Sequence, residues 1–405
     1  MKISIFSDLH LGFALNTPLE NDSFEQARQA MEQSLDSDLI IVCGDIFDNR
    51  FPKPDILTRA VQIFSIPSTV KTETRLFESI KKNVVKQHEG IPVIALHGTH
   101  ERVGREQYNA VQLLESAGLL YHLHKNGLIF EKNGIKVAIQ GMSGVPERYA
   151  SQILEEWSPQ PKEGCYNILL LHQNIVPFIY SPAEPSTLTI DSLPEGFDLI
   201  INGHIHSSRF EKIGDKKIIL AGSTIVTQAK KEEQAEKGIY KLLLPEEKVE
   251  FEPIKGQRKF IYEEIEIKEE RSIGEQIKEV IEKHRGNYQK KPLFKIKLKY
   301  NRLLSVDKDM KNIIDEYSNE FIIKYSKELT GEFLEKKVQI LREARESKIS
   351  IEELGIKILE ENIRKVGFDD KIDFLQLYSY MSGGDLEKAK KLILEGLVDD
   401  KSDNI

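Results

Sequence analysis

The sequence of 405 residues has only two cysteines, Cys43 and Cys165, and no long apolar run. Two isolated cysteines form neither a disulfide framework nor a zinc motif, and each stands beside an apolar run, so we expect reduced thiols in the core. No apolar stretch approaches the roughly 18 residues that span a bilayer. The N-terminus also lacks the cleavage site of a signal peptide. We therefore expect a cytoplasmic protein that does not enter a membrane.

Positive charge is in deficit as well, with 57 Lys and Arg against 65 Asp and Glu and a net charge of −8. This balance excludes a protein that coats nucleic acid by bulk electrostatics, so any contact with DNA must come from a local basic surface. The content of 40% hydrophobic and 30% charged residues is that of an ordinary globular protein. The length suffices for two or three domains.

Residues 1–258 alternate short apolar runs with amphipathic or turn-rich stretches, which is typical of a layered α/β domain. The apolar runs are short and nearly continuous, as buried strands are. The expected strands are 2–7, 38–43, 92–97, 136–141, 167–171, 198–202 and 217–221. The expected helices are 55–66, 73–87 and 106–117.

The pattern changes after residue 258. Residues 260–268 and 293–300 alternate like strands around a helical stretch at 272–284, which predicts a small β-α-β unit. From Val306 onward only helices are expected, with an apolar stripe from Met310 to Tyr325 and further helices at 331–346, 350–366 and 385–397. These helices either pack on one another or dock on a partner. The expected domains are 1–258, 259–302 and 303–405.

Histidine and aspartate residues follow five of the expected strands. In chain order these residues are Asp8 and His10, then Asp45, His100, His172, and finally His204 and His206. Because ligands bind where the carboxyl ends of strands meet, we expect these side chains to converge on one crevice. Gly44, Gly98 and Gly203 precede three of the clusters and permit the close backbone approach that a crowded ionic site needs.

Each cluster has a simpler explanation when it is taken alone. A single Asp-x-His after a strand is more often a turn or a helix cap than a pair of ligands. His122 and His124 have the spacing of metal ligands, but the run that holds them has no acidic residue at its end, and His97 lies within an expected strand. We interpret these three histidines as structural. The joint pattern of five clusters in order favours a metal site.

The number and type of these side chains indicate two metal ions. Four histidines and two aspartates exceed the needs of one tetrahedral ion, but they suit two divalent ions about 4 Å apart that share a carboxylate. Asp45 stands alone after its strand and is the natural bridge. A set of imidazoles and carboxylates without thiolate fits manganese, iron or zinc better than calcium or copper(I). The expected reaction class is phosphoester hydrolysis.

The clusters resemble the five phosphoesterase motifs of the calcineurin-like superfamily. They are Asp8-Leu9-His10, Gly44-Asp45-Ile46-Phe47-Asp48, Gly98-Thr99-His100-Glu101, His172-Gln173 and Gly203-His204-Ile205-His206. The stretches Gly44 to Pro54 and Leu193 to His206 are similar to those of the meiotic-recombination-eleven and SbcD nucleases of double-strand-break repair, especially the archaeal type. The resemblance covers residues 1 to about 300. It implies an α/β fold with a layered calcineurin-like metallophosphoesterase domain, a small β-α-β capping domain and an α-helical C-terminal tail.

The resemblance also implies roles for individual residues. One ion would be held by Asp8, His10, Asp45 and His206, and the other by Asp45, Thr99, His172 and His204. The implied cofactor is two manganese ions, with iron, magnesium or zinc as alternatives. His100 would contact the scissile phosphate rather than a metal ion. Position 99 departs from the family pattern, which usually has Asn there, so the neutral hydroxyl of Thr99 implies a weaker second metal site or an interposed water.

Fold and metal site do not choose between protein, nucleotide and nucleic-acid substrates. Residues 283–302 hold eight Lys and Arg and no Asp or Glu. In the strand at 293–300, lysines alternate with apolar residues and share one face, which can follow a phosphate backbone. The expected DNA-binding residues are Lys290, Lys291, Lys295, Lys297 and Lys299. A solvated face on a small domain is the alternative.

The sequence thus favours a manganese-dependent DNA exonuclease and endonuclease subunit that acts on DNA ends in double-strand-break repair. The resemblance implies that C-terminal helices bind an SMC-like coiled-coil ATPase of the SbcC or radiation-sensitivity-fifty type. It also implies a homodimer, for which 55–66 and 106–117 are candidate helices. The alternatives are a phosphodiesterase for nucleotides or other small substrates, and a catalytically weak scaffold that binds DNA ends for the ATPase.

Overall fold

The computed structural model describes residues 1–80, 89–104, 107–179, 186–268, 271–300, 306–329, 374–382 and 384–398. The chain divides into two compact units. The first comprises Met1–Ile265, Glu269–Lys297 and Val306–Ser326, and the second comprises Glu266–Lys268, Leu298–Ser305 and Lys327–Ile405. Within the described ranges, no helix combines the length and the apolar character needed to cross a membrane.

The first large sheet of unit one has, in its described part, six strands in the order β15-β14-β1-β2-β4-β5. These strands are β1 Lys2–Phe6, β2 Leu39–Cys43, β4 Val93–Leu96, β5 Tyr121–His122, β14 Gly238–Leu243 and β15 Lys248–Pro253. The run from β1 to β5 is parallel, and β14 and β15 add an antiparallel edge. All five residues of β2 are buried, which explains its continuous apolar sequence, because parallel strands are covered on both faces.

The second large sheet has seven described strands in the order β12-β13-β11-β8-β7-β6-β3. They are β3 Arg75–Ser79, β6 Asn126–Lys132, β7 Ile135–Met142, β8 Tyr166–Leu171, β11 Leu199–Asn202, β12 Arg209–Ile213 and β13 Lys216–Leu220. The central strands β7, β8, β11 and β13 are parallel, and both edges are antiparallel. A separate short pair joins β9 Ile175–Val176 and β10 Leu188–Thr189.

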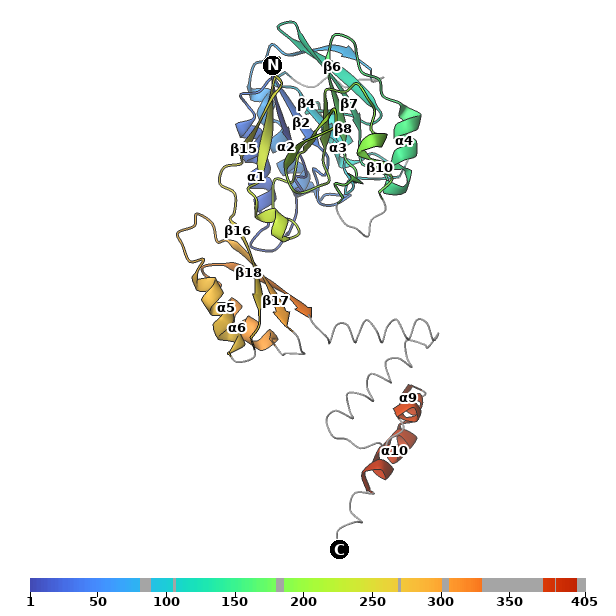
Figure 1. The fold of residues 1–405 in the computed structure, drawn as a ribbon, viewed down its shortest axis with the longest axis vertical. Coiled ribbons are helices and arrows are strands. Elements are labelled where there is room, and N and C mark those ends of the chain that lie inside the picture. The colour runs from blue at the N-terminus through green and yellow to red at the C-terminus, as the bar shows by residue number, and fades with distance from the viewer. Residues whose placement is uncertain are drawn as a thin grey trace. The chain divides into compact units, whose positions relative to one another are not determined.

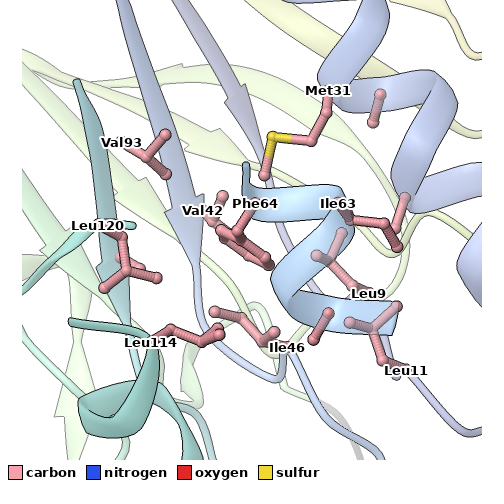
Figure 2. Close-up of a cluster of buried hydrophobic side chains, with 14 of the residues drawn as sticks. Leu9, Leu11, Met31, Val42, Ile46, Ile63, Phe64, Val93, Leu114 and Leu120 are labelled. Carbon is pink, nitrogen blue, oxygen red and sulfur yellow. The ribbon is translucent and has the colours of Figure 1, made fainter. Parts of the chain in front are cut away.

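The two sheets face one another and have helices on their outer sides (Figure 1). The helices are α1 Asp22–Gln33, α2 Pro54–Phe64, α3 Ala110–Ser116 and α4 Ala150–Trp157. One core cluster packs α1, α2 and α3 on the first sheet, and Figure 2 shows Met31 and Phe64 beside Val42 of β2. A second cluster fills the space between the sheets, and a third places α4 on the second sheet. The layered α/β architecture expected from the sequence is confirmed.

The seven strands expected between residues 2 and 221 are all present, as β1, β2, β4, β7, β8, β11 and β13. The helices expected at 55–66 and 106–117 correspond to α2 and α3, and α3 begins later than expected, after a capping box at Asn109. Helix α1 and the strands β5, β6, β14 and β15 were not expected from the sequence.

The helix expected at 73–87 is wrong in its described part. Residues Arg75–Ser79 form β3, which pairs antiparallel with β6 at the edge of the second sheet. Four of its five residues are exposed, including the charged Arg75 and Glu78, as is common for edge strands. The pairing partner β6 is nearly fifty residues away, so the local spacing of apolar residues did not reveal it. Residues 81–87 lie outside the described ranges.

A three-stranded sheet in the order β16-β17-β18 follows the large sheets, where the sequence predicted only a β-α-β unit. Its elements are β16 Phe260–Glu266, α5 Ile273–Glu282, β17 Leu293–Tyr300, α6 Asp307–Glu316 and β18 Ile322–Leu329. The expectation that all residues after Val306 are helical is therefore wrong for β18. Met310 and Ile313 are buried in α6, but the helical spacing continues by chance through Tyr317 and Phe321 in the turn. The following residues are rich in β-branched and aromatic types and pair with β17.

The described part of unit two ends in two helices, α9 Phe374–Ser382 and α10 Leu386–Val398. Helix α10 matches the helix expected at 385–397, whereas α9 was not expected. Gly384 has φ +77° in the turn between them, and the amide of Asp385 donates to the carbonyl of Tyr380 at 2.8 Å. The helices expected at 331–346 and 350–366 lie outside the described residues.

The two cysteines differ from one another. Cys43 is fully buried between the sheets, whereas Cys165 is only half-buried, so the expectation of two core thiols is wrong for Cys165. Cys165 precedes β8 in the turn that leads into that strand, and its neighbours there do not cover it completely. Both cysteines are free thiols, as expected.

Candidate metal centre

The loops that follow β1 and β2 lie side by side at the carboxyl edge of the first sheet. The amides of Asp8 and His10 donate to the carbonyls of Gly44 and Asp45, each at 3.0 Å. The parallel pairing of the two strands sets this register, because Phe6 lies opposite Val42. The pairing therefore brings Asp8 and His10 beside Asp45 although the residues are far apart in the sequence.

Four residues of the site have a left-handed backbone, which non-glycine residues seldom adopt. The φ angles are 54° for Asp8, 46° for His10, 45° for Asp45 and 70° for His204. Each such conformation costs on the order of 1 kcal/mol or more and persists only where the surroundings enforce it. The clustering of four strained residues at one edge indicates that these turns are shaped to aim side chains.

Glycines make the close packing of these loops feasible. A Cβ atom on Gly44, which has φ +97°, would overlap Nδ1 of His172, and one on Gly98 would overlap Oδ1 of Asp45. Both glycines therefore allow a backbone segment to touch a side chain of the site directly. This close approach is what the sequence led us to expect at these positions.

The structure brings the site residues expected from the sequence into two adjoining groups. Asp8, His10 and His206 form one group of mutually close ligand atoms, and Asp45, His172 and His204 form the other. In each group the candidate ligand atoms lie within 4.8 Å of one another. Asp8, His10, Asp45 and His172 are each at most 2% exposed. These residues come from both large sheets, whose parallel strands end at the same edge.

Hydrogen bonds at Nδ1 orient two of the histidine rings. Nδ1 of His172 lies 2.7 Å from the carbonyl of Cys43, and Nδ1 of His206 lies 2.6 Å from the hydroxyl of Thr227. A carbonyl can only accept, so Nδ1 of His172 carries a proton and Nε2 is the ring nitrogen left to bind a metal ion. Nε2 of His172 faces Oδ2 of Asp45 at 3.1 Å, and Nε2 of His206 faces Nε2 of His10 at 3.2 Å. Metal-binding histidines have this arrangement of an outer partner and an inward lone pair.

Thr99 and His100 reach Asp45 from the loop after β4. The hydroxyl of Thr99 donates to Oδ2 of Asp45 at 3.2 Å, and the amide of His100 donates to Oδ1 at 2.9 Å. The His100 side chain is exposed, and its Nδ1 lies 2.7 Å from the carbonyl of Asp48. The rings of His10 and His100 meet edge to face with 4.9 Å between centroids. His100 therefore stands at the open side of the centre.

Burial of several charges together perturbs the acid-base behaviour of the site. Burial raises the pKa of Asp8 to about 6, and the nearby charge of Asp45 adds to this rise while His172 opposes it. Burial also acts against ionisation of Asp45, but the nearby charge of His172 holds the pKa of Asp45 well below its usual range. Burial lowers the pKa of His204 to about 3. Against the effect of burial, the charge of Asp45 raises the pKa of His172 to about 10. Carboxylates that are crowded around a positive charge also suit a bound cation, which would replace the second proton of His172.

Individual oxygen and nitrogen atoms of these side chains are placed as ligands of divalent ions would be. Oδ1 of Asp8 is buried and accepts no hydrogen bond, although buried carboxylate oxygens normally have a partner. The contact of His172 with Asp45 is close but lies outside hydrogen-bond geometry. Lone pairs that converge without hydrogen atoms between them are expected where ligands surround a cation. The individual ligand roles nevertheless remain predictions.

A buried ion pair supports His206 from behind, and sequence reasoning missed it. Nζ of Lys237 donates to the carbonyl of His206 at 3.0 Å and to the hydroxyl of Ser223 at 3.0 Å, and it lies 3.4 Å from Glu233. Glu233 in turn accepts from the amides of Thr227 and Gln228. Lys237 and Glu233 lie beyond the last motif, and their sequence gave no sign that they would contact it.

Two acidic residues inside the motifs were also left without a role. Asp48 lies beside both His10 and His100 and forms a third group of close ligand atoms with them. Glu101 is fully buried and accepts from the amides of Phe47 at 2.7 Å and Gly98 at 2.6 Å, so it ties the loops after β2 and β4 together. Burial, with a smaller contribution from Asp45, raises the pKa of Glu101 to about 8.

The lysines of the small sheet divide into two sets. On β17 the apolar residues Phe294, Ile296, Leu298 and Tyr300 are buried, and the half-buried Lys295, Lys297 and Lys299 alternate with them, as expected. Lys290 instead pairs with Glu25 of α1 at 2.5 Å, and Nζ of Lys291 donates to the carbonyl of Ser318 at 3.0 Å. The charges of Lys290 and Lys291 are thus engaged within the protein. A role in DNA binding remains a prediction for all five residues.

Comparison with protein families places the chain in a class. Residues 1–208 match the calcineurin-like phosphoesterase family, which is more than half of the chain. The two facing sheets and the strand-end set of aspartates and histidines agree with this match. The chain belongs to the calcineurin-like phosphoesterase family.

Individual relatives give a narrower likeness. The chain is 30% identical over 302 residues to the "Double-strand break repair protein MRE11" of Encephalitozoon cuniculi, which covers 69% of this chain and 52% of that protein. It is 27% identical over 230 residues to the "DNA double-strand break repair protein Mre11" of Methanopyrus kandleri (53% and 46% covered). It is also 27% identical over 241 residues to the protein of that name in Archaeoglobus fulgidus (55% and 50% covered). The chain spans about half the length of these curated relatives.

Proposed function

We propose that the chain is a manganese-dependent DNA exonuclease and endonuclease that acts in double-strand-break repair. The observation that carries this proposal is the pair of ligand groups that Asp8, His10 and His206 form with Asp45, His172 and His204. Relatives whose names specify double-strand-break repair support DNA as the substrate.

In this proposal each ligand group binds one ion, and the residues keep their predicted assignments. Asp8, His10, Asp45 and His206 hold the first ion, and Asp45, Thr99, His172 and His204 hold the second. When bound, such ions lower the pKa of a water molecule and stabilise charge on phosphoryl oxygens. The protein contributes the shared carboxylate of Asp45, whose two oxygens are already fixed by Thr99 and His100.

His100 is the proposed phosphate-contacting residue. Its ring is exposed at the open side of the centre, and the carbonyl of Asp48 fixes the proton on Nδ1. Nε2 is then available to hold or transfer a proton at a phosphate oxygen. The exposed ring suits a group that meets the substrate rather than one that holds an ion between buried ligands.

The decisive experiment compares wild type with His100→Gln on duplex DNA with manganese. We expect a loss of about 10²- to 10⁴-fold in cleavage rate, the usual contribution of a group that transfers protons. Manganese affinity, measured by calorimetry, stays close to that of wild type. His284→Gln, at a histidine that pairs with Glu263 of the small sheet, is the matched control.

Three results separate the proposal from its alternatives. Loss of DNA cleavage in His100→Gln alone supports the nuclease. Hydrolysis of small phosphodiesters without cleavage of DNA supports a phosphodiesterase for small substrates. Binding of DNA ends without any hydrolysis by wild type supports a scaffold for the ATPase.

The proposed DNA-binding surface is the lysine face of β17, made of Lys295, Lys297 and Lys299. Lys324 of β18 lies close enough to Lys295 to lower its pKa, after the larger effect of burial, so the positive charge extends to the neighbouring strand. Replacing the three lysines by Glu should weaken duplex binding and reduce the slope of log affinity against log salt by roughly three. Unchanged binding at low salt would remove this surface from the proposal. Lys216→Glu, on β13 of the second large sheet, is the control.

The proposed homodimer uses α2 and α3. Tyr108 before α3 is 83% exposed and Leu113 within it is 44% exposed, and exposed large apolar side chains can mark a protein-protein interface. Sedimentation of wild type should show a dimer, and Leu113→Asp should shift the chain towards the monomer. A monomeric wild type would contradict this arrangement.

The proposed ATPase partner binds the C-terminal helices. Tyr378 and Met381 of α9 and Leu386 of α10 are exposed by 47%, 57% and 67%. A row of exposed apolar side chains on helices suits a helical partner such as the coiled coil of an SMC-like ATPase. Met381→Asp together with Leu386→Asp should abolish co-purification with such an ATPase and leave the nuclease activity of the isolated chain unchanged.

A further inference from the structure

A second group of histidines lies beside the metal centre and lines a pocket of about 850 Å³. The pocket is bounded by the loops that follow β2, β4 and β7 and by the segment between β5 and β6. Its volume falls in the range of small-molecule sites and is far larger than a single phosphate ion requires. The lining residues used below are Arg50, His97, Arg102, Gln112, His122, His124 and Asn126.

The histidine rings form one fixed wall. Nδ1 of His97 and Nε2 of His122 share a hydrogen bond of 2.9 Å, and the ring of His124 lies 5.3 Å from that of His97 at an angle of 38°. The hydroxyl of Ser143 donates to the carbonyl of Leu123 and accepts from the amide of His97, so it ties the two segments together. The sequence led us to interpret these histidines as structural, but all three also line the pocket.

The wall is neutral and has an unused polar atom. Burial, followed by the charge of Lys125, lowers the pKa of His124 to about 4, so this imidazole is uncharged at neutral pH. Nδ1 of His124 is buried and has no hydrogen-bond partner. A buried ring nitrogen without a partner is costly, so this ring offers a ligand its flat, uncharged face rather than that nitrogen.

The charges at the pocket are mainly positive. Arg50 and Arg102 line it, from the loops after β2 and β4. Among the described lining residues the acidic one is Glu115, whose carboxylate accepts from the amide of His122 at 3.0 Å. A guanidinium binds phosphate with two parallel hydrogen bonds, which makes arginine well suited to this group.

The pocket adjoins the catalytic loop directly. His97 immediately precedes Gly98, whose neighbours Thr99 and His100 bind Asp45. On the far side, a Cβ atom on Gly144 would come within 2.7 Å of the backbone of Gly98, so the pocket wall and the catalytic loop are in contact. A chain of nucleotides that reaches the metal centre can therefore place a neighbouring nucleotide here.

We propose that this pocket binds one nucleotide of the DNA strand next to the scissile phosphodiester. Its phosphate contacts Arg102 and Arg50, and its base lies against the imidazole rings of His97 and His124. Imidazole rings and guanidinium groups are common stacking partners for unpaired bases. Gln112 and Asn126 also line the pocket, and their amide groups can meet the edge of the base. That the nucleotide belongs to a DNA strand rests on the proposed nuclease function, whereas the binding of a nucleotide in this pocket does not.

The test measures nucleotide binding without metal. The full chain is titrated with dAMP and, separately, with inorganic phosphate in EDTA, and the histidine ring signals are followed by NMR. The variants are Arg102→Gln, Arg50→Gln and His124→Ala. Arg209→Gln, at an exposed arginine of β12, is the control. Thermal unfolding of each variant confirms that it is folded.

We expect dAMP to bind more tightly than phosphate and to shift the His124 signals. Arg102→Gln should weaken dAMP binding about tenfold, because it removes a charge-assisted contact, and Arg209→Gln should not. A short single-stranded oligonucleotide should compete with dAMP for the pocket, which ties the site to DNA rather than to a free nucleotide alone.

Three outcomes would overturn the proposal: equal affinity for phosphate and dAMP, dAMP binding that none of the three variants weakens, or no competition by the oligonucleotide. None of these measurements needs hydrolysis. If the protein binds dAMP but cleaves no DNA, the proposed nuclease function is wrong and the nucleotide-binding pocket still stands. A chain that cleaves DNA but shows any of the three outcomes would sink the pocket alone.

Discussion

Two groups of histidines lie next to one another in the phosphoesterase domain, and their neighbours differ. His10, His172, His204 and His206 stand among the carboxylates of Asp8, Asp45 and Asp48. His97, His122 and His124 stand among arginines and side-chain amides, and their acidic neighbour Glu115 is bound to a backbone amide. The first group can therefore attract cations, and the second suits a ligand that carries negative charge.

The comparison shows that the partner of an imidazole decides its chemistry more than the spacing of histidines does. His122 and His124 have the same H-x-H spacing as His204 and His206. In the metal centre, hydrogen bonds at Nδ1 of His172 and His206 turn Nε2 inward, towards Asp45 in one case and towards His10 and Asp8 in the other. In the pocket, Nδ1 and Nε2 of neighbouring rings bond to one another. Four predictions test whether the two groups are independent, from the largest expected effect to the smallest.

Asp45→Asn should abolish hydrolysis and lower manganese affinity more than about a hundredfold, because loss of an outer partner of a ligand already costs 10- to 100-fold. Asp45 joins both ligand groups and holds Thr99 and His100. Calorimetric titration with manganese and a DNA cleavage assay measure the effect. Binding of dAMP in EDTA should persist, and its loss would show that the two histidine groups form one site. Asp215→Asn, in the turn between β12 and β13, is the control.

Lys237→Met should destabilise the protein by about 3–5 kcal/mol, since it leaves Glu233 buried without its cation. Manganese affinity should fall as well, because Lys237 holds the backbone of His206. Denaturant unfolding and a manganese titration measure the two effects. The double variant Lys237→Met with Glu233→Gln should recover part of the stability but not the metal affinity. Equal recovery of both would mean that the ion pair is structural and does not position His206.

His122→Phe should lower stability by about 1–3 kcal/mol, because Nδ1 of His97 loses its partner in a buried position. Metal affinity should remain at the wild-type value, since His122 belongs to the second group. Thermal unfolding combined with a manganese titration separates the two quantities. A large fall in metal affinity would break the distinction between the groups.

Thr99→Asn should raise manganese affinity or turnover several-fold, because the free energy gained is on the order of that of one hydrogen bond. The amide oxygen of Asn reaches further than the Thr99 hydroxyl, which now donates to Asp45. Thr99→Ser keeps the hydroxyl and serves as the control. Equal or lower values for Thr99→Asn in a manganese titration would count against the assignment of position 99 to the second ion.

Much of the fold could be predicted because buried parallel strands have recognisable sequences. The central strands of both sheets appeared as short apolar runs, and β2 is buried along its whole length. Edge strands lack this property. Most residues of β3 and β15 are exposed, and charged residues stand among them, so their strand structure depends on pairing with β6 and β14 rather than on their own composition. Strand β18 was missed for another reason: its composition allows a strand, but the helical spacing from Met310 to Tyr325 hid it, and its pairing with β17 is not visible in the local sequence.

The sequence predicted which residues gather in the candidate metal centre, but it did not predict the residues that hold them in place from behind. Asp8, His10, Asp45, His172, His204 and His206 follow strands in order, and the rule that strand ends converge was enough to group them. Lys237 and Glu233 could not be found in this way, because no periodicity links them to His206. The pocket beside the centre was missed for a similar reason, since Arg50 and Arg102 meet the histidines only through loops that follow different strands.

The sequence by itself determined the family, the strand-end order of aspartates and histidines, and the alternation of lysines with apolar residues on β17. These follow from local periodicity and from motifs that each lie within a few residues. Only the tertiary structure decided which sheet each cluster came from, which carboxylates and which arginines surround each histidine, and where the edge strands lie. The physical reason is that pairing, burial and electrostatic contact join residues by distance in space, and separation along the chain does not encode that distance.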